Sequence, residues 1–235
     1  MNESALTIRP SNERGYADHG WLRSHHTFSF ASYYDPQHMG YRSLRVINED
    51  RVAPSQGFPM HAHQDMEIFT FVVSGQLEHK DSLGNGRIIQ AGEFQYMSAG
   101  SGVHHSEFNP SDAPVHFLQI WIEPNQKGAA PRYAEFSASE EGEVEGFRLL
   151  ASSSGRAGSI AIRQDAEIYS ATVRGSFQLP ATTLDWAWIQ LVKGSLTIDG
   201  DTLSAGDGAS FHTSHVFESL ATSDSEASFI LFYLI

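Results

Sequence analysis

The chain has 235 residues, with 15 Lys and Arg against 28 Asp and Glu, and its formal net charge is −13. Such an acidic surface repels phosphate groups, so direct binding of nucleic acid is not expected. The sequence contains no Cys, which excludes disulfides, thiolate nucleophiles, iron–sulfur clusters and zinc sites with Cys ligands.

No segment of the sequence predicts a membrane anchor or an export signal. The longest wholly apolar run, Phe229 to Ile235, has seven residues, whereas crossing a bilayer takes about 20. The N-terminal sequence MNESALTIRPSNERG has no apolar stretch after a basic start. We therefore expect a soluble, cytoplasmic protein with no membrane contact.

The first half of the chain is typical of β-structure. Residues 67–79 are rich in β-branched and aromatic side chains and precede the turn sequence DSLGNG, after which Arg87–Gln90 is expected to be a returning strand. Short apolar stretches follow at 91–100 and 116–122. Helical periodicity is weak everywhere except at 131–137, so the sequence predicts an all-β fold.

A change in composition divides the chain. Residues 134–148 contain five Glu among Ser, Ala and Gly, and such a polar segment has little to bury. We expect an acidic linker there, between an N-terminal domain at 1–133 and a C-terminal domain at 149–235.

The second half repeats sequence features of the first. FVVSGQLEH at 71–79 is similar to QLVKGSLTI at 190–198, and AGE at 91–93 matches AGD at 205–207. IDGD at 198–201 is a hairpin signal, and the glycine spacing makes the second hairpin shorter. These matches predict two related β units in tandem.

Ten of the 12 histidines lie between His19 and His116, and two motifs stand out among them, HAH and HHSE. Alternate side chains of a strand share a face, so His61 and His63 point the same way, as do His105 and Glu107. If their strands are neighbours, three imidazoles and one carboxylate surround one point. This ligand set suits a divalent first-row metal ion. The alternative is that they are ordinary hydrogen-bonded or surface histidines.

Other histidines fit this pattern less well. The parity of His104 is opposite to that of His105, so His104 is expected to face away from the site. In the second half, Pro180 and Thr182 occupy the positions that correspond to the first histidine pair. His212 and His215 are three residues apart and fall on opposite faces of a strand. We therefore expect no metal ligands in the C-terminal domain.

The motif HAHQDME, the later G-x-x-H-x-x-x-N and the repeated Gly-turn pattern resemble the cupin superfamily. The pairing of H-x-H with H-x-E, with HGWL and HTFSFASYYDP near the N-terminus, resembles the pirin family, in particular its bacterial quercetin 2,3-dioxygenase-like members. The resemblance implies two tandem cupin barrels of jelly-roll type, a bicupin, with a single metal in the N-terminal barrel. It implies metal ligands at His61, His63, His105 and Glu107.

Glu67 is a second candidate carboxylate. In many cupins the glutamate after H-x-H is a metal ligand, whereas in pirin-like members the carboxylate comes from H-x-E, here Glu107. Two carboxylates would reduce the Lewis acidity of the ion, so we favour Glu107. Glu67 is then expected to sit nearby, and its role as a neighbour or a ligand stays open.

Four N-terminal histidines lie in an aromatic segment, and the resemblance suggests that this segment closes the barrel. We expect them to pack and to form hydrogen bonds rather than to bind metal. They are His19, His25, His26 and His38.

The resemblance implies a dioxygenase that opens the ring of a flavonol such as quercetin with O2 and releases CO. Fe(2+) is the first choice of metal by resemblance, and the ligand types also allow Mn, Ni, Co, Cu or Zn. Three imidazoles and one carboxylate leave a net positive site that favours an anionic substrate oxygen, and Glu107 could accept the proton of the flavonol hydroxyl.

Two other functions stay open. One is a metal-dependent, redox-sensing regulatory protein that binds a protein partner, and the other is a cupin enzyme that acts on another small enolisable substrate. A dioxygenase predicts an aromatic-lined cavity open at the metal, whereas a regulator predicts an exposed patch and a closed metal site. The sequence does not indicate which aromatic side chains would line the cavity.

Overall fold

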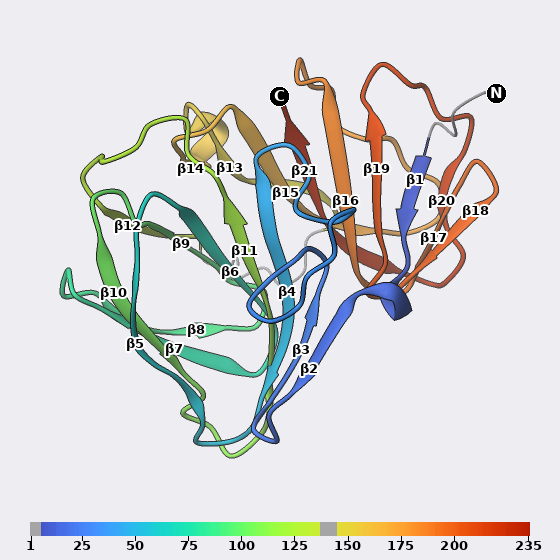
Figure 1. The fold of residues 1–235 in the computed structure, drawn as a ribbon. Coiled ribbons are helices and arrows are strands. Elements are labelled where there is room, and N and C mark those ends of the chain that lie inside the picture. Colours follow the sequence, from blue (N-terminus) through green and yellow to red (C-terminus); the bar gives the residue numbers. More distant parts are fainter. Residues whose placement is uncertain (1–5, 137–144) are drawn as a thin grey trace. The chain divides into compact units, whose positions relative to one another are not determined.

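The computed structural model describes residues 6–136 and 145–235, and these fall into two compact units. Their regular structure consists of β-strands and two short 3-10 turns, η1 (Ser11–Glu13) and η2 (Arg156–Gly158). Figure 1 shows strands throughout both units, as the all-β prediction requires. Within the described residues, no helix is long and apolar enough to cross a membrane.

The N-terminal unit contains residues 15–136 and 162–164 and is built from two antiparallel sheets. The seven-stranded sheet has the order β12-β9-β6-β11-β4-β3-β2, and the four-stranded sheet has the order β5-β10-β7-β8. The strands of the large sheet are β2 (Gly15–Asp18), β3 (Leu22–His26), β4 (Leu44–Val52), β6 (Glu67–Ser74), β9 (Phe94–Ser98), β11 (Val115–Ile122) and β12 (Arg132–Phe136). The strands of the small sheet are β5 (Gly57–His63), β7 (Gln76–Asp81), β8 (Gly86–Gln90) and β10 (Val103–Phe108).

One apolar cluster joins the two sheets of this unit. Leu77 and Ile89 of the small sheet pack with Val72 and Phe117 of the large sheet, and all four side chains are at most 1% exposed. Alternation along each strand supplies these inward side chains. This apolar cluster fixes the small sheet, which includes β5 and β10, against the large sheet.

The predicted strand at 67–79 is two strands, β6 and β7, which turn at Gly75. Gly75 has φ 80°, and a Cβ atom at this position would lie 3.0 Å from the Pro114 carbonyl oxygen. The returning strand, β8, is confirmed. The helical periodicity at 131–137 does not correspond to a helix, because residues 132–136 form β12, which pairs with β9.

The C-terminal unit contains the described residues 6–14, 145–161 and 165–235. Its seven-stranded sheet has the order β1-β19-β16-β21-β15-β13-β14, and a three-stranded sheet has the order β18-β17-β20. The strands are β1 (Leu6–Arg9), β13 (Gly146–Ser152), β14 (Ile160–Ala161), β15 (Ala166–Val173), β16 (Trp186–Lys193), β17 (Ser195–Ile198), β18 (Asp201–Ser204), β19 (Gly208–His212), β20 (Leu220–Thr222) and β21 (Ala227–Leu234).

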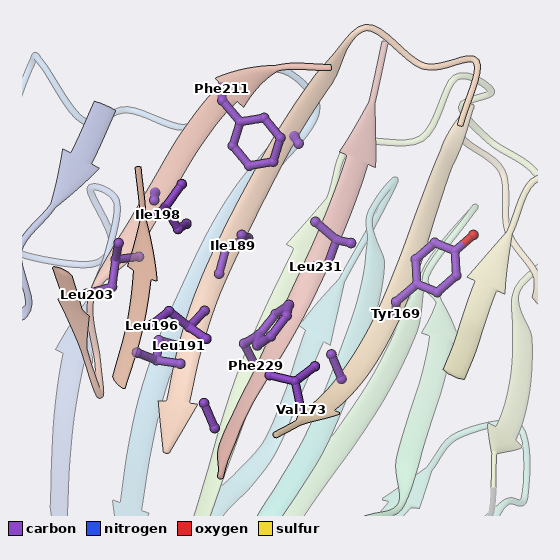
Figure 2. Packing of buried hydrophobic residues seen from close by; sticks show 14 of the residues in the cluster. Tyr169, Val173, Ile189, Leu191, Leu196, Ile198, Leu203, Phe211, Phe229 and Leu231 are labelled. Atoms are coloured by element: carbon purple, nitrogen blue, oxygen red, sulfur yellow. The ribbon is translucent and has the colours of Figure 1, made fainter. Parts of the chain in front are cut away.

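The core of the C-terminal unit lies between its two sheets. Figure 2 shows side chains of β15, β16, β19 and β21 together with those of β17 and β18. The apolar run Phe229 to Ile235 forms most of β21, which lies between β15 and β16 in the sheet. Consecutive side chains of this strand are buried, so both of its faces are covered, in agreement with its apolar sequence. The labelled members are Tyr169, Val173, Ile189, Leu191, Leu196, Ile198, Leu203, Phe211, Phe229 and Leu231.

The two large sheets repeat the same strand order. β9, β6, β11 and β4 of the N-terminal unit correspond to β19, β16, β21 and β15, and the β7–β8 hairpin corresponds to the shorter β17–β18 hairpin. In the C-terminal unit, β1 pairs with β19 at the edge where β12 pairs with β9 in the N-terminal unit. The first strand of the chain thus covers an open edge of the second unit.

The units differ from the expected domain boundaries at two places. Residues 6–14 belong to the C-terminal unit, although we expected 1–133 to be one domain. β12 and β13 extend into the expected linker at 134–148, where Glu135 forms an ion pair with Arg87. The central part of that linker, 137–144, lies outside the described residues.

The place of β1 can be tested with Leu6, which is buried in the C-terminal core and pairs in register with Phe211. We expect Leu6→Ala to lower the free energy of unfolding by about 2–3 kcal/mol, because it leaves a cavity in the core. Thr7→Ala, an exposed position on the same strand, should change it by less than about 1 kcal/mol. Calorimetric unfolding measures both. Equal, wild-type stability of the two variants would mean that β1 does not pack there.

Candidate metal centre

Three histidines of the N-terminal unit face one another on β5 and β10. These strands pair antiparallel, with His61 opposite His105 and His63 opposite Val103. The ring centroids of His61 and His105 are 4.4 Å apart, and those of His63 and His105 are 4.9 Å apart. One potential ligand atom from each ring lies within 4.8 Å of the others, and no other group of three or more His, Asp or Glu side chains among the described residues does the same. The structure therefore brings the three histidines of the two motifs together.

Burial favours the neutral form of two of the three imidazoles, and a hydrogen bond orients the third. The Nδ1 atom of His61 lies 2.7 Å from the Pro59 carbonyl oxygen, which places the proton on Nδ1 and leaves Nε2 free to bind a metal. Burial, followed by the neighbouring His105 and His61, lowers the pKa of His63 to about 4. Burial, followed by His61 and His79, lowers the pKa of His105 to about 3. Neutral imidazole is the form that binds metal ions.

The unpartnered ring nitrogens of His105 indicate that the three histidines fit a metal ion. Its side chain is 1% exposed, and neither ring nitrogen has a hydrogen-bond partner among the described residues. Buried polar atoms are normally paired. A divalent ion bound by the three imidazoles would give His105 the missing partner. His104 is exposed, as its opposite parity predicts.

Glu107 lies on β10, two residues beyond His105, and is buried. Its Oε1 atom accepts hydrogen bonds from Thr70 Oγ1 and Gln119 Nε2, both at 3.0 Å, and its Oε2 atom accepts one from Gln119 Nε2 at 2.8 Å. The group of three histidines defined by ligand distance does not include Glu107, but the residue lines the same cavity as His61 and His63.

The close approach of β5 to β10 beside Glu107 requires a glycine. A Cβ atom at Gly57 would lie 2.2 Å from the Glu107 carbonyl oxygen, which no side chain can tolerate without movement of the backbone. The register of the two strands also shifts between His105 and Glu107, and such bulges re-aim side chains next to functional sites.

Glu67 is engaged elsewhere, so the expectation that it sits beside the metal is wrong. Its carboxylate accepts hydrogen bonds from the Tyr96 and Ser98 hydroxyls, both at 2.5 Å, and from the Arg163 backbone N–H at 3.0 Å. Glu67 and Thr70 are three residues apart on regular β6, so they lie on opposite faces. Since Thr70 donates to Glu107, Glu67 points away from Glu107.

A cavity of about 230 Å³ opens beside the histidines. Exposed residues such as His19 and Ala31 reach it, so solvent has access. Its aromatic wall includes Trp121, whose ring contacts His63 edge to face at a centroid distance of 4.9 Å. Other lining residues are Ala17, Leu22, Ser24, His26, Phe30, Ser32, Asn48, Asp50, Phe58, His61, His63, Glu107 and Gln119.

The N-terminal histidines were expected to pack and to form hydrogen bonds. His26 does so, since its Nδ1 atom lies 2.8 Å from Asn48 Oδ1. His25 packs against Tyr16 in a tilted arrangement, with ring centroids 4.9 Å apart. His19 and His26 also line the cavity, although neither belongs to the group of three.

Several residues that line this site or contact Glu107 were not predicted from the sequence. Thr70 and Gln119 are polar side chains at inward positions of otherwise apolar strands, IFTFVV and HFLQIWI. That interruption is the signal that could have indicated them. Trp121 also lines the cavity, which the sequence did not indicate, and its indole Nε1 atom has no partner among the described residues.

Asp50 is the other residue of note in this cavity. It lies on β4, is 4% exposed, and shares an inward face with Asn48. Burial raises the pKa of Asp50 to about 7, and the nearby Glu107 and Glu49 add to the rise while a hydrogen bond from Ser24 opposes it. Nothing in the local sequence distinguishes this aspartate from a surface residue.

The C-terminal unit has a cavity of its own, about 850 Å³ in volume. Pro180 and Thr182, which correspond to the first histidine pair, lie on its wall, as does His215. The Nε2 atom of His215 is 3.8 Å from an Asp199 carboxylate oxygen.

Two tandem β units with the same strand order, one of which presents three histidines on facing strands, define a two-domain cupin. The chain belongs to the pirin family, since residues 7–122 match the Pirin family model and residues 149–234 match that of the quercetinase C-terminal cupin domain.

Similarity to individual relatives extends over nearly the whole chain. The chain is 46% identical over 228 residues to the protein named quercetin 2,3-dioxygenase of Escherichia coli (strain K12), covering 94% of this chain and 96% of that one. It is 41% identical over 221 residues to a pirin-like protein of Caulobacter vibrioides, covering 93% and 95%.

Solved structures agree with these similarities. The crystal structure of YhhW from Escherichia coli has a TM-score of 0.91 and 44% identity, covering 98% of this chain and 97% of that one. The structure of bacterial pirin YhhW in complex with nickel(II) has a TM-score of 0.88 and 43% identity, covering 97% and 98%.

The histidine group can be tested with two adjacent residues. We expect His105→Ala to abolish stoichiometric binding of a divalent metal, because it removes one of three convergent nitrogens. His104→Ala, which changes the exposed neighbour, should retain the metal. Elemental analysis after dialysis of both variants measures the metal content. Full occupancy in His105→Ala would show that the metal binds elsewhere.

The burial of Asp50 predicts a specific dependence of stability on pH. Between about pH 4 and pH 7 the folded state holds a proton on Asp50 that the unfolded state has lost, so Asp50 lowers stability as the pH rises. Asp50→Asn removes this effect, and its stability relative to wild type should rise with pH by at most about 1.4 kcal/mol per unit. Urea unfolding of the metal-free proteins at pH 5 and 7 measures it.

The exposed Asp112 supplies the control for this experiment. Asp112→Asn should follow the pH dependence of the wild type. If the stability of Asp50→Asn had the same pH dependence as that of the wild type, the Asp50 carboxyl group would ionise equally in the folded and unfolded chains. That result would contradict a raised pKa of Asp50 in the folded state.

Proposed function

We propose that the chain is a metal-dependent dioxygenase that opens the ring of a flavonol such as quercetin with O2 and releases CO. The observation that carries this proposal is the group of three convergent imidazoles beside a cavity that also contains the buried Glu107 carboxylate. The quercetin 2,3-dioxygenase name of the Escherichia coli relative supports it. We place the protein in the cytoplasm.

His61, His63 and His105 would hold the metal ion, and Glu107 would supply a carboxylate ligand. A divalent ion there would act as a Lewis acid that favours the anionic form of a substrate hydroxyl. Nickel in the YhhW structure supports a divalent first-row ion. Fe(2+) is our first choice on family resemblance, and Mn, Ni, Co, Cu and Zn share its ligand preferences.

Glu107 would also accept the proton of the flavonol 3-hydroxyl group. Its Oε1 atom already accepts two hydrogen bonds and its Oε2 atom accepts one, so Oε2 has the greater remaining capacity for a proton. Gln119 and Thr70 fix the orientation of the carboxylate, and this fixed position favours proton transfer.

The walls of the cavity suit an aromatic substrate. Phe30, Phe58 and Trp121 present flat apolar surfaces, and aromatic rings pack well against one another in tilted and offset arrangements. The volume of about 230 Å³ is below the roughly 300–1,000 Å³ of typical ligand sites. A flavonol would thus place one part inside, and the rest would extend towards the exposed rim.

The small cavity also favours a second candidate function, a cupin enzyme that acts on a smaller enolisable substrate. Such a substrate would fit entirely within the volume beside the histidines and would lose its proton to the same Glu107 carboxylate. The third possibility, a redox-sensing regulator with a protein partner, predicts a closed metal site, and the access through His19 and Ala31 argues against it.

Turnover of quercetin tests the proposal. The metal-loaded protein should remove the flavonol absorbance only when O2 is present, with release of CO. Glu107→Gln should lower kcat/KM by roughly 100-fold or more, the usual effect of losing a general base. Glu78→Gln, which alters a carboxylate on β7 outside the cavity, should keep the wild-type rate.

Full metal occupancy without any O2-dependent loss of quercetin would contradict the flavonol proposal and favour the smaller substrate. A wild-type rate in Glu107→Gln would exclude Glu107 as the proton acceptor.

A further inference from the structure

The cavity beside the metal centre contains a second acid whose hydrogen bonds are incomplete. Asp50 lies opposite Phe117 of β11 and Ser24 of β3 in the large sheet, and its side chain lines the cavity. Ser24 hydrogen-bonds the carboxyl group. The Oδ1 atom is buried and has no hydrogen-bond partner among the described residues.

An unpaired carboxyl oxygen inside a protein is costly, because burial removes the water that would otherwise bind it. The charged neighbours of Asp50 do not offset this cost, since Glu49 and Glu107 are both acids. A buried acid of this kind lowers the free energy of unfolding, and acids in such surroundings are typical of functional positions.

Two other buried polar groups on this wall have partners. Asn48 bonds His26 at 2.8 Å, and Glu107 is occupied by Thr70 and Gln119. Among the described residues that line the cavity, the buried polar atoms without a hydrogen-bond partner are Asp50 Oδ1 and Trp121 Nε1. A ligand that filled the cavity would therefore meet Asp50 as an unused hydrogen-bonding group.

We propose that Asp50 is a specificity-determining residue, whose carboxyl group pairs with a substrate hydroxyl other than the one that Glu107 deprotonates. This inference rests on the proposed function, because it assumes a polyhydroxylated aromatic substrate. A hydroxyl group can donate to an ionised Asp50 or accept from a protonated one, so the pairing holds in either state. Molecules that lack that hydroxyl leave Asp50 unpaired and bind more weakly.

The pairing is tested by combining substitutions of Asp50 with the removal of single hydroxyl groups from the ligand. The dissociation constants of quercetin and of analogues that each lack one hydroxyl are measured without O2 on metal-loaded protein, so that no turnover is needed. For wild type, loss of one particular hydroxyl should weaken binding roughly ten- to hundredfold, as for a hydrogen bond to a charged group. For Asp50→Leu, the same loss should have no effect.

Two further variants keep the test decisive. Asp50→Ala also removes the carboxyl group and should lose the discrimination in the same way, which covers the case in which Asp50→Leu does not fold. Asp112→Asn, at an exposed aspartate outside the cavity, should discriminate like the wild type.

The proposal is overturned if the loss of each hydroxyl weakens binding to a folded variant without the Asp50 carboxyl group as much as it weakens binding to the wild type, or if no flavonol binds at all. If one hydroxyl shows the Asp50-dependent effect but O2 consumption is absent, the pairing stands and the dioxygenase function fails. The two results are therefore distinguishable.

Discussion

The antiparallel pairing of β5 with β10 is the constraint on which the metal centre depends. It sets His61 opposite His105 and brings His63 to the same face. A slip of one residue would turn the side chains of one strand to the other face and separate the imidazoles. Gly57 permits the close contact of the two strands beside Glu107, so backbone packing and ligand geometry are coupled.

The chemistry of the cavity follows from burial. Imidazoles with lowered pKa values remain neutral and available as ligands, while Glu107 and Asp50 are acids in surroundings poor in water. Glu107 is paired by Gln119 and Thr70, whereas Asp50 keeps one free oxygen. The same wall therefore offers one oriented proton acceptor and one unused hydrogen-bonding group, two different roles set by their partners.

Local pattern was enough to predict the all-β fold and the convergence of His61, His63 and His105, because strand alternation decides which side chains share a face. It did not predict what depends on register between distant strands. Glu67 was misplaced because its partners come from β9 and from Arg163. β1 was assigned to the wrong unit, since an edge strand carries no signal of the sheet it completes.

Anomalous diffraction from crystals of the metal-loaded protein, recorded on both sides of the absorption edge of the bound metal, tests the central claim most directly. One strong peak is expected about 2.0–2.1 Å from a nitrogen of each of His61, His63 and His105, the usual metal–imidazole distance. A peak bound by other residues, or the absence of a peak among these three rings in crystals with full metal content, would contradict it.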